Sequence, residues 1–149
     1  MEDEGDAGIV ISSDHAGWDL KEAIKSYFNE KKTPIVDLSE PVFDPNDDYP
    51  AYAFRLAKAV AAGRFERGIA VCGSGIGASI AANRIRGVRA AFCVSEEMAV
   101  LSRKHNNANV LVLGGRFTSP EQAALMIEAW LSTEFEGGRH ARRVQQLDR

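Results

Sequence analysis

The stretch Gly68-Ile-Ala-Val-Cys72-Gly-Ser-Gly-Ile-Gly77-Ala-Ser-Ile-Ala-Ala-Asn83 decides the fold of this chain. Residues 68–72 are apolar on successive positions, as in a strand that is covered on both faces. Three glycines at alternate positions then lead directly into small and apolar residues that predict a helix over residues 77–83. A strand, a tight turn and a helix in this order are half of a βαβ unit, which indicates a parallel sheet.

The same alternation extends outward from this stretch. Strand patterns cover residues 9–12, 34–37, 68–72, 88–93 and 109–113. Helical patterns lie between them, and the starts of two helices are marked by Pro50 and by Ser119 with Pro120. We therefore expect an α/β fold, a three-layer αβα sandwich around a five-stranded, parallel, doubly wound (Rossmann-like) sheet, with a C-terminal helix over residues 139–149.

The composition is ordinary for a globular chain of 149 residues, with 45% hydrophobic and 26% charged residues. Residues 1–8 carry four carboxylates and are expected to be a disordered acidic tail, with a single domain over residues 9–149. The net charge of −3 makes nucleic acid an unlikely partner. There is no basic leader and no apolar run that could span a bilayer, so we expect a cytoplasmic protein without a membrane partner.

Ligands of doubly wound folds bind beyond the carboxyl ends of the strands, where the glycine-rich turn lies. Gly73, Gly75 and Gly77 can turn backbone N–H groups toward one point at the positive end of the next helix, which suits an oxyanion or a phosphate. A simple tight turn explains the same glycines equally well. Cys72 lies next to a predicted helix N-terminus, a position that favours a thiolate. The alternative for Cys72 is a buried structural cysteine, and this is the interpretation we give to Cys93.

Other polar residues follow the predicted elements. Asp14 and His15 come after the first strand, His105 and Asn106 end the fourth helix, and Arg116 follows the fifth strand; Arg139 and Arg143 share a helical face. Each group has a structural alternative, such as a helix cap or a solvated basic tail. Gathered at one edge of the sheet, they would form a site for a small phosphorylated substrate and for proton transfer.

Five motifs, in order and with matching spacing, resemble the type B ribose-5-phosphate isomerases over residues 9–147. They are Ser13-Asp14-His15-Ala16-Gly17, Asp48-Tyr49-Pro50, Cys72-Gly-Ser-Gly-Ile-Gly77 with Ala81-Ala-Asn83, His105-Asn106 before Asn109-Val110, and Glu136-Gly-Gly-Arg-His140 with Arg143. The same superfamily includes galactose-6-phosphate and allose-6-phosphate isomerases. The resemblance therefore indicates the type of reaction more firmly than the sugar.

The resemblance implies an aldose–ketose isomerisation of ribose 5-phosphate and ribulose 5-phosphate through a cis-enediolate, with neither a cofactor nor a metal. In this interpretation Cys72 is the base, and the catalytic set also includes Asp14, Ser74 and His105, of which His105 assists ring opening. The amides of the glycine loop hold the enediolate oxygen. The substrate-binding residues would be His15, Tyr49, Gly73, Gly75, Ile76, Gly77, Asn106, Arg116, Arg139 and Arg143.

Members of this family are similar in forming homodimers, often paired into homotetramers, in which residues such as His105 and Arg116 reach into the neighbour's site. Three alternatives stay open at this point. One is an isomerase of a six-carbon or four-carbon sugar phosphate. Another is a non-catalytic module that binds a flavin or a nucleotide, which the glycine spacing disfavours. The third is a metal-dependent isomerase, which the lack of a His, Glu and Asp group with ligand spacing disfavours.

Overall fold

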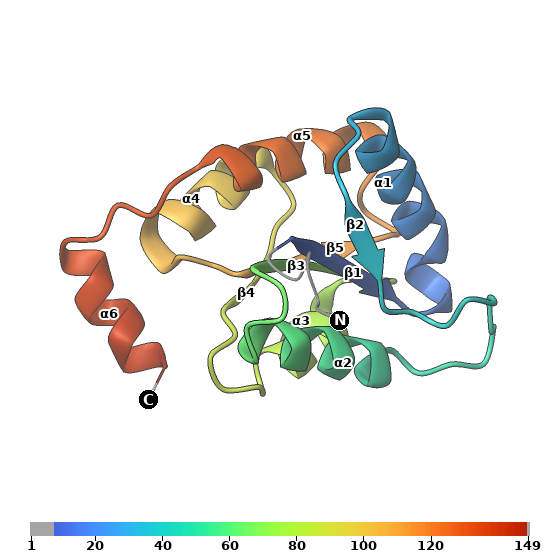
Figure 1. Ribbon diagram of the computed structural model, residues 1–149, viewed down its shortest axis with the longest axis horizontal. Helices are drawn as coiled ribbons and strands as arrows, with labels where there is room; N and C mark the ends of the chain where they lie inside the picture. The colour runs from blue at the N-terminus through green and yellow to red at the C-terminus, as the bar shows by residue number, and fades with distance from the viewer. Residues whose placement is uncertain (1–7, 149) are drawn as a thin grey trace.

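The computed structural model describes residues 8–148 and has the expected α/β architecture (Figure 1). Its five strands pair in parallel throughout, in the order β2-β1-β3-β5-β4. The strands are β1 (Ile9–Ser13), β2 (Ile35–Asp37), β3 (Arg67–Cys72), β4 (Ala90–Phe92) and β5 (Val110–Gly114). β2 and β4 are the edge strands: the chain runs outward from β1 to β2 on one side, and on the other it passes from β3 to the edge at β4 before β5 fills the place between them, as in a doubly wound sheet.

Helices cover both faces of the sheet. They are η1 (His15–Gly17), α1 (Trp18–Glu30), α2 (Tyr49–Ala61), α3 (Ile76–Ala82), α4 (Glu96–Asn106), α5 (Pro120–Ser132) and α6 (Arg139–Leu147). In Figure 1, α1, α4 and α5 lie above the sheet, and α2 and α3 lie below it. The three-layer prediction is confirmed.

Each interface between the layers has its own apolar core. Val10, Leu56, Ala70 and Val112 belong to the cluster on the side of α2 and α3. The cluster on the other side includes Ile11, Ile69, Leu111 and Trp130, all of them fully buried. Neighbouring residues of one strand therefore point into different cores, which is why the strands read as continuous apolar runs.

Local signals set the starts of the helices where the sequence predicts them. Ser119 and Gln122 form a complete capping box at the start of α5. The side chain of Ser95 accepts a hydrogen bond from the N–H of Met98 at the start of α4. Strand β4 (Ala90–Phe92) is shorter than the predicted 88–93; just before it, the N–H of Arg89 donates to the Asn109 side chain at 2.8 Å instead of to a neighbouring strand.

The C-terminal helix α6 does not cover the sheet. It follows Gly137 and Gly138, which have φ angles of +71° and +58°, and it lies beside α4, away from α1 and β2 (Figure 1). His140 and Val144 are its buried residues. The position of α6 decides which functional residues one chain can bring together.

The expected acidic tail falls on residues 1–7, which lie outside the described residues, and on Gly8, whose carbonyl accepts a hydrogen bond from Glu66 at 3.0 Å. Within residues 8–148, the structure has no helix of the length and apolarity needed to cross a membrane.

Candidate active site

The loop after β3 wraps its N–H groups around the Cys72 sulfur and the start of α3. The N–H of Gly75 donates to Cys72 Sγ at 3.2 Å, and the N–H of Ile76 donates to Ser74 Oγ at 3.1 Å. Gly75 is the N-cap of α3 with a φ of +83°, and a Cβ atom there would lie 2.5 Å from the Phe92 ring. Glycine is thus required at position 75 by conformation and by space.

The loop after β5 is hydrogen-bonded to the loop after β3 through their backbones. Gly115 donates to the carbonyl of Cys72 at 2.8 Å, and Arg116 donates to the carbonyl of Gly73 at 2.9 Å. A Cβ atom at Gly114 would lie 2.4 Å from the carbonyl oxygen of Ser74. This close approach of two backbones brings the Arg116 side chain next to Gly73, where a Cβ atom would lie 3.5 Å from Arg116 Nε.

These loops enclose one open cavity of about 440 Å³ at the carboxyl edge of the sheet. Its lining residues are Ala16, Tyr49, Cys72, Gly73, Ser74, Ile76, Gly77, Ile80 and Arg116. The Tyr49 ring lies so close to Gly77 that a Cβ atom there would be 2.4 Å from it. The cavity therefore combines a thiol, a turn of backbone N–H groups, a phenol and a guanidinium.

Asp14 lies at the end of β1, beside this cavity. It is buried, it is the N-cap of η1, and its Oδ1 accepts a hydrogen bond from the N–H of Gly17 at 3.0 Å. Burial raises the pKa of the Asp14 carboxyl above its usual value, against the opposing effect of that hydrogen bond. A raised pKa is typical of a carboxyl group that exchanges protons at an active site, although an N-cap role explains the contact with Gly17.

His15 is paired with a residue that the sequence analysis missed. Its Nδ1 lies 2.7 Å from Asp47 Oδ1, and its backbone N–H donates to the same oxygen at 2.9 Å. The hydrogen bond with Asp47 raises the pKa of the His15 imidazole. His15 adjoins Ala16 of the cavity but is not among the residues that line it. The only signal for Asp47 was its place directly before the Asp48-Tyr49-Pro50 motif.

His105, Asn106, Arg139 and Arg143 are not at this edge of the chain's own sheet. Helix α4 leaves β4 at the carboxyl edge and returns to the start of β5, so its last residues lie at the amino edge. The expectation that one sheet edge of a single chain gathers all the candidate residues is therefore wrong, because a crossover helix runs antiparallel to its strands.

At the amino edge, His105 stacks on His140 from α6 with 4.2 Å between ring centroids and an interplanar angle of 13°. Glu136 Oε1 lies 3.5 Å from His140 Nε2. Burial lowers the pKa of His140, and the neighbouring His105 and Arg139 add to this effect. Asn106 lines a separate cavity of about 450 Å³ with Arg89 and Leu147, and Arg139 and Arg143 are exposed on α6.

Two side-chain amides of the recognised motifs have structural contacts. Asn83 both donates to the carbonyl of Ala90, at 3.0 Å, and accepts from its N–H, at 2.8 Å. Asn109 accepts from the N–H of Arg89 and donates to the carbonyl of Gly87. Both residues secure the edge strand β4, so these contacts give a structural reason for the two asparagines.

The residues that the structure describes include two clusters with the donor atoms of a metal site, although the sequence analysis expected no metal. One is Asp14, His15 and Asp47, and the other is His105, Glu136 and His140. In the first, His15 and Asp47 already bond to each other. In the second, the two imidazole rings stack nearly parallel, so their in-plane lone pairs lie in separate planes. That the chain needs no metal stays a prediction from the sequence.

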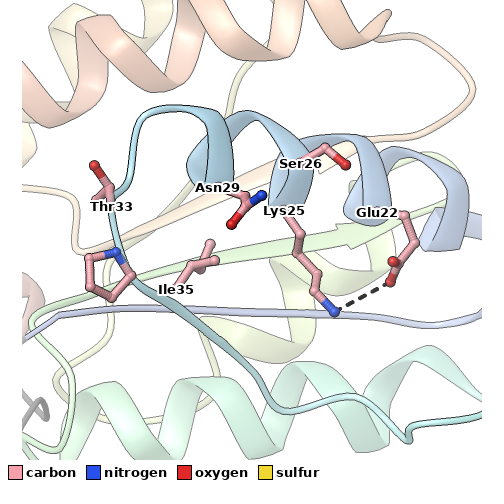
Figure 2. A pocket seen from close by; sticks show the side chains of 7 residues that line it. Glu22, Lys25, Ser26, Asn29, Thr33 and Ile35 are labelled. Carbon is pink, nitrogen blue, oxygen red and sulfur yellow. Dashed lines mark ion pairs between the residues drawn. The ribbon is translucent and has the colours of Figure 1, made fainter.

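A further hollow, of about 460 Å³, lies between α1 and β2 (Figure 2). On α1, Lys25 and Glu22 form an ion pair at 3.5 Å, and Lys25 also pairs with Asp37 of β2 at 2.9 Å. Ser26, Asn29 and Thr33 supply the other polar groups. With its only cation already paired to two carboxylates, this hollow offers a substrate less than the Cys72 cavity does.

The fold is that of an α/β enzyme, and the Cys72 cavity at the carboxyl edge of its parallel sheet is the candidate active site. The chain belongs to the ribose/galactose isomerase family, whose sequence model matches residues 9–147. It is therefore an isomerase, as the resemblance of its motifs implied.

Relatives of known structure share the whole fold. The crystal structure of a ribose 5-phosphate isomerase from Thermotoga maritima is 44% identical with a TM-score of 0.91, covering 95% of this chain and 97% of that one. Ribose-5-phosphate isomerase B from Mycoplasma genitalium, solved with bound ribulose 5-phosphate, is 43% identical with a TM-score of 0.88, covering 94% and 93%. The D-erythrulose-4-phosphate isomerase of Pectobacterium atrosepticum is 43% identical over 93% of this chain and 91% of its own.

Proposed function

We propose that this chain interconverts D-ribose 5-phosphate and D-ribulose 5-phosphate through a cis-enediolate, with Cys72 as the base. The observation that carries the proposal is the hydrogen bond from the Gly75 N–H to Cys72 Sγ, inside a cavity that Arg116 also lines. This contact gives the sulfur a backbone hydrogen-bond donor next to the N-terminus of α3, the setting in which cysteines act as bases or nucleophiles. The solved relative with bound ribulose 5-phosphate supports the choice of substrate.

The proton transfer follows from this arrangement. With the sugar in its open aldose form, the Cys72 thiolate removes the proton from C2, and the electron pair forms the C1–C2 double bond while negative charge develops on the C1 oxygen. The proton then returns from Cys72 to C1, the O2 proton passes to the C1 oxygen, and the C2=O bond forms, which gives the ketose and restores the thiolate. Free N–H groups in the loop over residues 73–77, where α3 begins, would stabilise the developing oxyanion.

The phosphate group needs cations, and one chain supplies only some of them near Cys72. Arg116 lines this chain's own cavity, and not a neighbour's as the resemblance implied, and His15 adjoins it. Arg139 and Arg143, at the other edge, would reach the phosphate from a second copy of the chain, as would His105 for ring opening and Asn106 for the sugar. Ile76 and Ile80, which line the cavity, are 56% and 54% exposed and offer apolar surface for such a copy to cover. We therefore propose a homodimer or homotetramer with shared sites.

Other sugar phosphates are the second candidate. The relative named for D-erythrulose 4-phosphate is about as similar to this chain as those named for ribose 5-phosphate. The cavity is open rather than closed around a chain of fixed length, so a substrate one carbon shorter or longer also fits the proposed chemistry.

The deciding experiment assays the purified full chain on ribose 5-phosphate in the presence of EDTA. Erythrose 4-phosphate, allose 6-phosphate and galactose 6-phosphate are assayed in parallel. We expect chelator-resistant turnover with the highest kcat/KM for ribose 5-phosphate. A higher kcat/KM for another sugar would keep the chemistry and correct the substrate, whereas no turnover of any of them would contradict the proposal.

A further inference from the structure

Asp47 is an inward-turned carboxylate in an otherwise exposed segment. Residues 41–46, which precede it between β2 and α2, are all exposed, whereas the Asp47 side chain is only 9% exposed. Its Oδ1 receives both the backbone N–H and the ring Nδ1 of His15, at 2.9 and 2.7 Å. A carboxylate with so little exposure to water destabilises the folded state unless it is paired. The contact with His15 therefore stabilises the inward orientation of the Asp47 side chain.

The same segment holds the His15 ring from a second side. Phe43 meets it edge-on with 6.5 Å between ring centroids, and Phe43 in turn contacts Trp18 edge-on at 5.7 Å. His15 nevertheless keeps 38% of its side chain exposed. With Nδ1 occupied by Asp47, Nε2 is the ring nitrogen left for a ligand.

Two carboxylates and no cation dominate the electrostatics around His15. The hydrogen bond with Asp47 is the largest influence and raises the pKa of His15. Burial is the next and lowers it, but the negative charges of Asp14 and Asp47 add to the hydrogen bond, so the net shift is upward. Asp47 also faces Tyr52 of α2, and it adds to the effect of burial in raising the pKa of that phenol. The pairing with Asp47 therefore favours the protonated imidazole more than an unpaired histidine would, and in that form the Nε2–H is a charged donor.

We infer that Asp47 is a positioning residue that holds His15 as a cation, by its Nδ1, with Nε2–H free to donate to a phosphate oxygen of the substrate. The inference rests on the proposed function, in which His15 binds the phosphate group. It adds an acidic residue to the electropositive end of the site, and its role is to act through His15 rather than to touch the substrate.

The pairing has a definite consequence for pH dependence. A phosphate monoester acquires its second negative charge near pH 6, and binding is best where this dianion meets a protonated His15. Asp47 extends that range upward. Replacing Asp47 by the uncharged isostere should therefore move the alkaline fall of kcat/KM to lower pH, with KM raised and kcat nearly unchanged.

The test compares Asp47→Asn with Asp44→Asn, which removes the same charge from an exposed site of the same segment. The chain has three histidines, so an NMR titration can follow His15 directly, assigned through His15→Gln. We expect a lower His15 pKa in Asp47→Asn only. At pH 8 the KM for ribose 5-phosphate should rise roughly tenfold, the usual effect of losing one charge-assisted hydrogen bond, with a smaller rise at pH 6.

Two controls keep the inference open to contradiction. In a His15→Gln background, Asp47→Asn should raise KM no further, because Asp47 acts only through His15. Binding of inorganic phosphate, measured by the same NMR titration, should weaken in Asp47→Asn even if the chain proves inactive on ribose 5-phosphate, which separates this inference from the proposed function. An unchanged His15 pKa, or a lowered one with phosphate binding and KM unaltered, would overturn it.

Discussion

Cys72 and His105 lie at opposite edges of the same sheet. Cys72 is the last residue of β3, whereas His105 is in the last turn of α4, which leads back to the start of β5. The stack of His105 on His140 holds the ring there. If both residues serve one reaction, they belong to different copies of the chain.

Mixing two inactive variants tests this arrangement. We expect Cys72→Ala and His105→Asn chains, denatured and refolded together, to regain activity. In each mixed dimer one site receives both mutations and the other receives neither, so random pairing restores about a quarter of the sites. The matched control mixes Cys72→Ala with Arg116→Ala. Because both residues line the cavity of one chain, that mixture should regain nothing. Recovery in the control, or none in the first mixture, would disprove sharing as described.

The two cysteines should differ in reactivity. Both are buried, but burial raises the pKa of the Cys93 thiol to about 11, whereas Cys72 receives an N–H donor and borders an open cavity. Iodoacetamide should therefore modify Cys72 first at pH 8, and ribose 5-phosphate should slow that modification. Mass spectrometry of the labelled peptides measures both rates. Faster labelling of Cys93, or no protection by substrate, would count against the site.

Gly114 is expected to be essential for the shape of the site. A Cβ atom there would lie 2.4 Å from the Ser74 carbonyl oxygen, which is backbone and cannot rotate away. Gly114→Ala should cost about 2 kcal/mol of unfolding free energy and abolish most activity. Gly63→Ala is the control, because Gly63 has a φ of +81° but open space around it. It should lose about 1 kcal/mol and keep its KM, as measured by denaturant unfolding and steady-state kinetics.

A buried ion pair should make stability depend on acid pH. Burial favours the neutral form of Asp37, but its bonds to Lys21 and Lys25, each at 2.9 Å, outweigh this and lower the pKa of Asp37 below the usual 3.8. The stabilisation is then complete above pH 3.8 and is lost as the pH falls through the lowered value. Asp37→Asn removes the nearer carboxylate from the fully buried Lys21 and leaves it with Glu22 at 3.4 Å, so it should cost about 3 kcal/mol at pH 7.

Urea unfolding at several pH values measures this effect. The difference in unfolding free energy between the wild type and Asp37→Asn should stay constant from pH 7 to pH 5 and shrink at lower pH. Glu40→Asn is a suitable control, since Glu40 is exposed and lies 3.5 Å from Arg55. A pH-independent difference for Asp37→Asn would mean that charge is not the reason for its effect.

Much of the fold could be predicted because its signals are local. Each signal spans only a few consecutive residues, as the apolar run over residues 68–72 and the capping box of Ser119 and Gln122 do. The glycine loop was predictable as a candidate site for the same reason, since it directly follows a strand. The position of His105 at the amino edge of the sheet could also have been predicted, because a crossover helix ends at the amino edge.

Two features could not be read from the sequence. The pairing of Asp47 with His15 joins residues 32 positions apart through a segment without periodicity, so only tertiary packing reveals it. The direction of α6 depends on the φ angles of Gly137 and Gly138, and glycine permits many such angles without encoding one. The positions of Arg139 and Arg143, which lie on α6, follow from the direction of this helix.

The most direct test of the central claim is to measure turnover and binding of ribose 5-phosphate by Cys72→Ala, with Cys93→Ala as the matched control. We expect kcat to fall by about 10²- to 10⁴-fold in Cys72→Ala, the usual contribution of a general base, while the Kd for the sugar phosphate stays close to that of the wild type. Cys93→Ala should keep its kcat. A Cys72→Ala enzyme that turns over ribose 5-phosphate at nearly the wild-type rate would show that Cys72 is not the base.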